Sequence, residues 1–218
     1  MTAIAGASGG RPTARQLAER RAAFRKLHQG GCFVIPNPWD VGTARYLGRL
    51  GFQALATTSA GFAFSRGLPD TGAVTRDMAL GHIAEIVAAS DLPVNADFQA
   101  GHSRTPEGVG ENVRLCVETG VAGLSIEDAT GDPTRPLYDV ALAVERIKAA
   151  RAAIDASGAD VLLTARARAE PTLTRRTPSS ARSATVRPAL QPMRTLTGFG
   201  ATAFTMTAIA SLSRGPGA

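Results

Sequence analysis

Short apolar runs that end in polar residues recur along the first three quarters of the chain, and each is followed by a segment of helical periodicity. The apolar runs occupy residues 32–35, 53–59, 93–98, 121–128 and 161–166. Helices are expected near residues 13–28, 40–50, 75–90, from 105 onward and near 139–156, with residues 60–72 as a loop. Because no hairpin signal separates the runs, the pattern predicts five βα units with a parallel sheet covered by helices.

The helix starts carry recognisable capping residues. Thr13 and Gln16 have the spacing of a capping box, and Asp40 stands before the second helical segment. Thr105 followed by Pro106 combines a capping residue with a proline at the first helical position. These signals support the helical assignments independently of the apolar pattern.

The run at residues 93–103 has the most unusual end. Val94, Ala96 and Phe98 supply apolar bulk, whereas Asp97 and His102 place ionisable groups where the strand finishes. In parallel α/β proteins, ligands bind at the carboxyl ends of the strands. We therefore expect this segment to lie at the centre of a functional site.

Other strand ends contribute residues of matching chemistry. A parallel sheet would bring the following polar residues together at one edge: Ser59, Asp70, Asp97, Gln99, His102, Glu127, Asp128 and Arg166. Several carboxylates beside one arginine suit a hard cation such as Mg²⁺ together with an anionic substrate.

Taken singly, each residue also has a purely structural interpretation. Asp70 could be a turn residue, Asp97 could accept from loop amides, and Glu127 could cap a segment. His102 could contact a ligand or could simply be a loop histidine. His28 and His82 are expected at the surface.

Charge is distributed unevenly. The chain has 218 residues, 44% of them hydrophobic, and a net charge of +6. Residues 1–166 contain equal numbers of basic and acidic side chains, so residues 167–218 carry the whole excess. This last segment has no helical or strand period and is either a disordered basic tail or the product of a reading-frame shift, which is the hypothesis we favour. With two aromatic residues and no folded reader motif, it argues against a nucleic-acid partner.

The sequence thus divides into a flexible N-terminal arm at 1–12, a catalytic βα domain at 13–166 and a mostly irregular basic tail at 167–218. Cys32 and Cys116 lack a metal-type spacing and are expected to be buried free thiols. No apolar run is long enough to span a membrane, and the first residues lack the apolar core of a signal peptide. We expect a cytoplasmic protein without a membrane partner.

Six motifs occur in the order seen in the isocitrate lyase/phosphoenolpyruvate mutase family, which residues 14–166 resemble. They are Asn37-Pro38-Trp39-Asp40, Thr57-Thr58-Ser59-Ala60-Gly61, Gly67-Leu68-Pro69-Asp70, the segment 93–103, Ser125-Ile126-Glu127-Asp128 and Leu163-Thr164-Ala165-Arg166. The resemblance implies a (β/α)₈ TIM barrel, here incomplete because only five units are visible, and it implies a homo-oligomer. It also implies Mg²⁺, or Mn²⁺ in its place, and a small carboxylic acid substrate.

The resemblance assigns roles to residues. Asp97 would bind the metal directly, and Asp70 and Glu127 would hold its water shell. Thr58, Ser59 and Ala60 would bind the carboxylate end of the substrate. Arg166 would grip substrate oxygens and, with His102, act in catalysis.

Two departures from the family pattern narrow the expected activity. Gln99 stands where many members have an acidic residue, and residues 131–136 read Gly-Asp-Pro-Thr-Arg-Pro where isocitrate lyases carry a Lys-Cys-Gly-His motif. The chain is therefore not expected to be a true isocitrate lyase. We expect a lyase, mutase or hydrolase that acts on a C–C or P–C bond of a 2-oxo or 2-hydroxy acid through an enolate-like intermediate. The alternative is an inactive barrel fragment or a binding pseudoenzyme.

Overall fold

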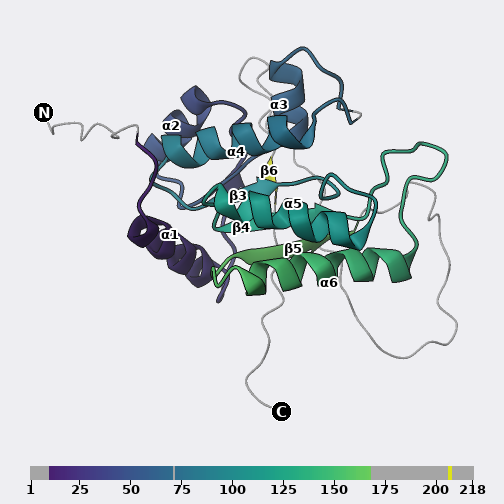
Figure 1. Ribbon diagram of the computed structural model, residues 1–218. Helices are drawn as coiled ribbons and strands as arrows, with labels where there is room; N and C mark the ends of the chain where they lie inside the picture. The colour runs from purple at the N-terminus through teal and green to yellow at the C-terminus, as the bar shows by residue number, and fades with distance from the viewer. Residues whose placement is uncertain (1–9, 71, 168–205, 208–218) are drawn as a thin grey trace, which may run out of the picture. The chain divides into compact units, whose positions relative to one another are not determined.

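The computed structural model describes residues 10–70, 72–167 and 206–207. Helices and strands alternate through most of this part of the chain, as Figure 1 shows. The elements are α1 (Ala14–Leu27), β1 (Ile35–Pro36), α2 (Val41–Arg49), β2 (Leu55–Ala56), α3 (Ser59–Ser65), α4 (Arg76–Ala89), β3 (Val94–Asp97), α5 (Pro106–Glu118), β4 (Gly123–Glu127), α6 (Val140–Ala156), β5 (Leu162–Arg166) and β6 (Met206–Thr207). The predicted α/β class is confirmed.

The capping residues act as the sequence predicts. Thr13 accepts a hydrogen bond from the Gln16 backbone at 3.3 Å, while its own N–H donates to the Gln16 side chain at 2.8 Å. Asp40 accepts from the backbone N–H of Thr43 at 2.6 Å, and Thr105 caps α5. Each cap satisfies a backbone donor that the helix itself leaves unpaired, which fixes where the helix begins.

Strands β2, β3, β4 and β5 form a parallel sheet in chain order. The register places Ala96 opposite Leu124 and Leu124 opposite Leu163. β1 pairs antiparallel with β6, and the Asn37 side chain donates to the Ala56 carbonyl at 3.0 Å, which ties the end of β1 to β2. All strand ends that carry the predicted site residues therefore point to one edge.

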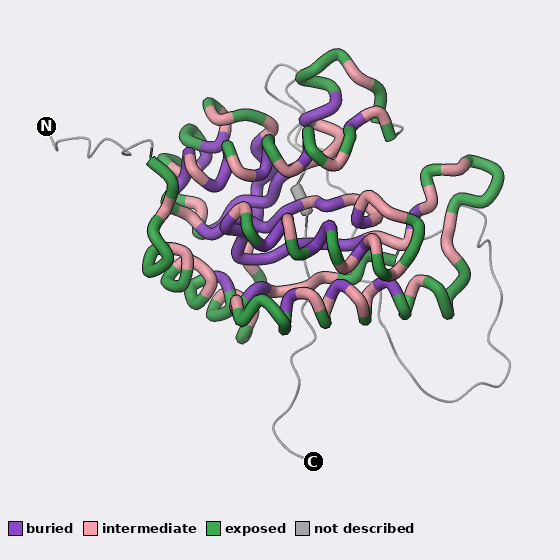
Figure 2. The backbone as a smooth tube through the Cα atoms, viewed as in Figure 1, coloured by how far each residue is buried: buried purple, intermediate pink, exposed green. Residues whose placement is uncertain are grey.

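Apolar side chains of α4, α5 and α6 pack on the sheet. α5 and α6 lie side by side, and buried positions concentrate in the strands and on the inward faces of the helices (Figures 1 and 2). Fully buried members of this core include Ile86, Val113, Leu124, Ile126 and Ile154. This burial of aliphatic side chains is the main stabilising contribution. β5 is less buried than β3 and β4, because the described residues pair only one of its edges.

Helix α1 covers the amino ends of the strands. Its Phe24 is 1% exposed and packs with Ile35, Ala54, Ala56 and Ala122. A Cβ added at Gly123 would lie 2.5 Å from Phe24 Cε1 and 2.7 Å from Asn95 Oδ1. Only glycine at this position lets the aromatic ring and the start of β4 approach so closely.

Arginines of the same helix bind main-chain carbonyls and carboxylates at this end of the sheet. Arg21 donates to the carbonyls of Val121 and Val117 at 3.1 and 3.4 Å, and Arg20 donates to that of Val87 at 3.0 Å. Arg25 forms a two-point ion pair with Asp160. α1 is thus held by both apolar packing and charge-assisted hydrogen bonds.

Several expectations from the sequence were wrong. The strand expected at residues 32–35 is observed at Ile35–Pro36. The loop expected at residues 60–72 begins as helix α3, because Thr58 accepts from the Gly61 N–H at 3.2 Å and Phe62 and Ala63 bury their side chains. His82, expected at the surface, is 6% exposed and stacks on Phe62, with ring centroids 4.1 Å apart. Of the two cysteines, Cys116 is buried as expected, whereas Cys32 is exposed.

The expected arm at residues 1–12 and the expected tail at 167–218 lie almost entirely outside the described residues. Within the described ranges, no helix combines the length and apolar character needed to cross a membrane. The residues that can be interpreted functionally are those of the βα region.

Candidate functional site

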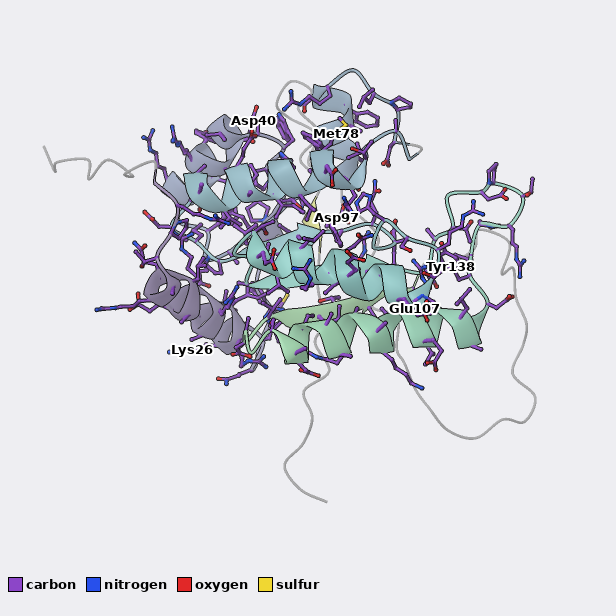
Figure 3. The ribbon with its side chains drawn as sticks, in the orientation of Figure 1. Lys26, Asp40, Met78, Asp97, Glu107 and Tyr138 are labelled. Atoms are coloured by element: carbon purple, nitrogen blue, oxygen red, sulfur yellow. The ribbon has the colours of Figure 1, made fainter. Side chains whose placement is uncertain are left out.

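A cavity of about 1220 Å³ opens at the carboxyl ends of the strands. All but one of the residues expected at the site from the sequence line it: Thr58, Ser59, Ala60, Asp70, Asp97, Gln99, His102, Glu127 and Arg166. The exception is Asp128, which is not among the lining residues. Figure 3 shows Tyr138, which also lines the cavity, at the opposite end of the sheet from Lys26 of α1. The structure therefore brings together side chains that are up to 108 positions apart in sequence (Thr58 to Arg166).

The Asp97 carboxylate is anchored by several hydrogen bonds. Its Oδ2 accepts hydrogen bonds from the backbone N–H and the hydroxyl of Ser59, at 2.9 and 2.8 Å. Its Oδ1 accepts from Nη1 of Arg166 at 2.9 Å, and its own N–H donates to the Thr57 hydroxyl at 2.9 Å. Four contacts, from Thr57 after β2, Ser59 at the start of α3 and Arg166 of β5, thus fix the end of β3.

Arg166 lies between two carboxylates. The register of β4 and β5 sets it opposite Glu127, and its Nη2 lies 4.0 Å from Glu127 Oε2. The side chains of Asp97 and Glu127 are 17% and 16% exposed, whereas that of Arg166 is 41% exposed. The cation is therefore more exposed to solvent than the two carboxylates.

His102 lines the cavity in surroundings that favour the neutral form of its ring. Burial lowers its pKa, the nearby Asp97 opposes this shift, and Arg76 adds to it. Its Nε2 is buried and has no hydrogen-bond partner within the described part of the chain, and its ring packs on Phe98 at a centroid distance of 5.0 Å. An imidazole with an unused ring nitrogen can exchange a proton with a group that enters the cavity.

The cavity also contains residues that the sequence interpretation did not single out. Asn95 lies on the same strand face as Asp97, two positions earlier, and is 3% exposed. Its Oδ1 has no hydrogen-bond partner among the described residues. The alternation of side chains along a strand was the signal that could have identified it.

The oxygen atoms that line the cavity are the type of ligand that a hard cation prefers. Asp97, Glu127 and the unpaired oxygen of Asn95 are oxygen donors, which Mg²⁺ prefers, and Mg²⁺ is commonly held by one or two carboxylates and several waters. Residues 10–70 and 72–167 contain no ready-made group of three or more His, Cys, Asp or Glu side chains around one point. The residues therefore fit Mg²⁺ in donor chemistry, with Asp97 and Glu127 held in place by Arg166.

The segment between β4 and α6 forms one wall of the cavity. An antiparallel bridge between Ala129 and Leu137 closes it into a narrow loop, and the Tyr138 N–H donates to the Asp128 carbonyl at 2.9 Å. Thr130, Asp132 and Pro136 of this loop line the cavity. None of the described lining residues is a cysteine, which agrees with the absence of the Lys-Cys-Gly-His motif.

Comparison with known proteins identifies the family. The family model described as phosphoenolpyruvate phosphomutase matches residues 24–209. The 2-methylisocitrate lyase of Escherichia coli K12 is 35% identical over 112 residues, which is 50% of this chain and 38% of that protein.

Two solved structures are also similar. One, from Burkholderia cenocepacia J2315 and assigned as a lyase/mutase candidate, is 51% identical with a TM-score of 0.68, over 71% of this chain and 55% of that one. The other, oxaloacetate acetylhydrolase in complex with its product oxalate, is 27% identical with a TM-score of 0.65, over 72% of this chain and 55% of that one.

The chain covers between 38% and 55% of the length of these relatives. The described residues form a partial barrel of the (β/α)₈ type, as the sequence predicts. Because the family model covers most of the sequence, the chain belongs to the isocitrate lyase/phosphoenolpyruvate mutase family.

Proposed function

We propose that the protein is a Mg²⁺-dependent lyase, mutase or hydrolase that acts on a C–C or P–C bond of a small 2-oxo or 2-hydroxy carboxylic acid. The observation that carries this proposal is the convergence of Asp97, Glu127 and Arg166, from three adjacent parallel strands, on one cavity. Paired carboxylates with a neighbouring guanidinium suit a cation and a carboxylate ligand at the same place.

The residues divide the work by position. Asp97 would bind the ion directly, and Asp70 and Glu127 would hold its water shell. Bound Mg²⁺ supplies Lewis-acid polarisation of a substrate oxygen, which favours an enolate-like intermediate. Ser59 orients the Asp97 carboxylate through two hydrogen bonds. Arg166 offers a forked donor to a substrate carboxylate, and Thr58 and Ala60 flank that end.

His102 is the proposed proton carrier. Its burial keeps the ring neutral, so Nε2 can accept a proton from the substrate without first losing one.

A direct test uses the purified full chain with a panel of acids: oxaloacetate, 2-methylisocitrate, 2,3-dimethylmalate and phosphonopyruvate. We expect one of them to be consumed in the presence of Mg²⁺ or Mn²⁺ and not after EDTA treatment. Turnover that survives EDTA unchanged would contradict the proposal.

A binding pseudoenzyme is the second candidate, and one observation favours it. Arg166 already engages Asp97 Oδ1, so a metal at that atom must displace an ion pair. This candidate predicts that oxalate with Mg²⁺ raises the melting temperature while no acid of the panel is consumed. We further propose that the protein acts in the cytoplasm and that it forms a homo-oligomer. Gel filtration with light scattering would test the oligomeric state.

A further inference from the structure

Five consecutive backbone carbonyls in the loop between β3 and α5 are bound by two buried side chains. Arg146 of α6 donates through Nη1 to the carbonyls of Ser103 and Arg104, at 2.6 and 2.8 Å, and through Nη2 to that of Ala100. Asn112 of α5 donates to the carbonyls of the two residues between them, Gly101 and His102, at 3.0 and 3.1 Å. Figure 1 shows α5 and α6 side by side.

Burial makes these contacts energetically important. Arg146 is 1% exposed and Asn112 is 6% exposed. Within the described ranges Arg146 forms no salt bridge, so the cost of removing its guanidinium from water is offset by loop carbonyls and by the Tyr138 ring, whose centroid lies 4.0 Å from Cζ. A buried cation that binds only carbonyls and an aromatic face strongly constrains the groups that satisfy it.

The same loop contains backbone strain. Gln99 and His102 have φ angles of 48° and 50°. These angles lie in the left-handed region, which is unfavourable for residues other than glycine. Such conformations cost about 1–3 kcal/mol each and persist only where the surroundings enforce them. Both residues line the cavity, so the strained positions are also the ones that face the ligand.

We propose that Arg146 and Asn112 are positioning residues for the cavity: they hold the β3–α5 loop in the strained conformation that places Gln99 and His102 beside Asp97. Arg146 also connects this loop to a second part of the cavity wall, because Tyr138 belongs to the segment between β4 and α6. The use of a carboxylate ligand as probe rests on the proposed function, whereas the loop conformation can be measured without it.

The test compares Arg146→Lys with Arg21→Lys in the full chain. Lysine keeps the charge but loses the planar fork that reaches several carbonyls at once. Arg21 is the matched control, because it also donates to two main-chain carbonyls but lies at the amino end of the sheet. We expect Arg146→Lys to speed amide hydrogen exchange in peptides covering residues 98–105 and to weaken oxalate binding with Mg²⁺ about tenfold by calorimetry. Arg21→Lys should leave both measurements within twofold of the wild type.

Asn112→Asp gives a second route if Arg146→Lys does not fold. Aspartate removes both donors to the loop but can keep the contact that Nη1 of Arg76 makes with Asn112 Oδ1 at 3.3 Å. Unchanged exchange of residues 98–105 in a folded variant would overturn the inference, and so would faster exchange with unchanged oxalate affinity. If the wild type binds no oxalate, the proposed function fails, and the positioning role then stands or falls on the exchange data alone.

Discussion

The two ends of the sheet use similar residues for different purposes. At the amino end, Arg20, Arg21 and Arg25 of α1 donate to carbonyls and carboxylates in contacts that hold the helix in place. At the carboxyl end, Asn95 Oδ1 and His102 Nε2 are buried without hydrogen-bond partners in the described residues. Leaving a buried polar atom unpaired costs about 1–3 kcal/mol. The contacts of α1 stabilise the amino end, whereas the cavity keeps polar groups available for a ligand.

The largest expected effect comes from the cavity end. Asp97→Asn should lower Mg²⁺-dependent turnover roughly 100- to 1,000-fold, because it removes the charge that a hard cation needs. The free energy of unfolding should change by less than about 1 kcal/mol, since the Arg166 partner is partly exposed. Steady-state kinetics and urea unfolding check both parts. Asp155→Asn, on the exposed face of α6, is the control and should leave turnover unchanged.

The next effect concerns pH and the buried His82. Burial lowers its pKa from 6.5 to about 4, with Arg66 adding to the shift and Asp40 opposing it. Above pH 6.5 both folded and unfolded states are neutral; between pH 6.5 and 4 only the unfolded state takes up a proton. Stability should therefore fall as the pH falls through this window, by at most about 3 kcal/mol, and level off below it.

His82→Phe should remove most of that dependence, because phenylalanine can keep the stacking on Phe62 without titrating. Urea unfolding at pH 7.5 and 5.0 measures the difference. Burial also lowers the pKa of His102, so a smaller pH dependence of the same sign should remain. Equal losses of stability in variant and wild type would show that His82 is not the group responsible.

At the amino end, Arg21→Ala should lower the free energy of unfolding by about 2 kcal/mol, since it leaves the carbonyls of Val121 and Val117 without their charged donor. Oxalate affinity should stay within twofold of the wild type. A large loss of affinity without loss of stability would contradict the division of roles between the two ends.

The smallest effect is expected from the exposed pair of Arg25 and Asp160, whose side chains are 44% and 55% exposed. Hydrogen bonding to Arg25 lowers the pKa of Asp160, yet solvent screening limits what the pair contributes. Asp160→Asn should cost about 0.5–1 kcal/mol by chemical denaturation, and less in 1 M salt. A cost above that of Arg21→Ala would reverse the expected order.

Local sequence signals predicted most of the fold. Capping residues such as Thr13, Asp40 and Thr105 act within one helical turn, and apolar strands define themselves by their own composition. The helix at 59–65 was missed because glycine and serine are common loop residues, and tertiary burial of Phe62 decides its conformation. Likewise, the exposure of Cys32 and the burial of His82 depend on which elements pack beside them.

The sequence predicts which residues line the site, but it does not predict how these residues contact one another. Polar residues at strand ends identify Asp97, Glu127 and Arg166, because parallel strands bring their carboxyl ends together. The pairing of Arg166 with Asp97 depends on the register of three strands, which no local pattern encodes. The contacts of Arg146 were missed for the same reason, since they join residues more than 40 positions apart.

Gly123 shows how thin the separation between the two ends is. The position of its missing methyl group lies within contact of both the Phe24 ring and Asn95 Oδ1. The helix that closes the amino end and the floor of the cavity are therefore separated by a single layer of main chain. A redesign of the cavity floor for a different ligand must therefore also accommodate the Phe24 ring on the other side of that layer.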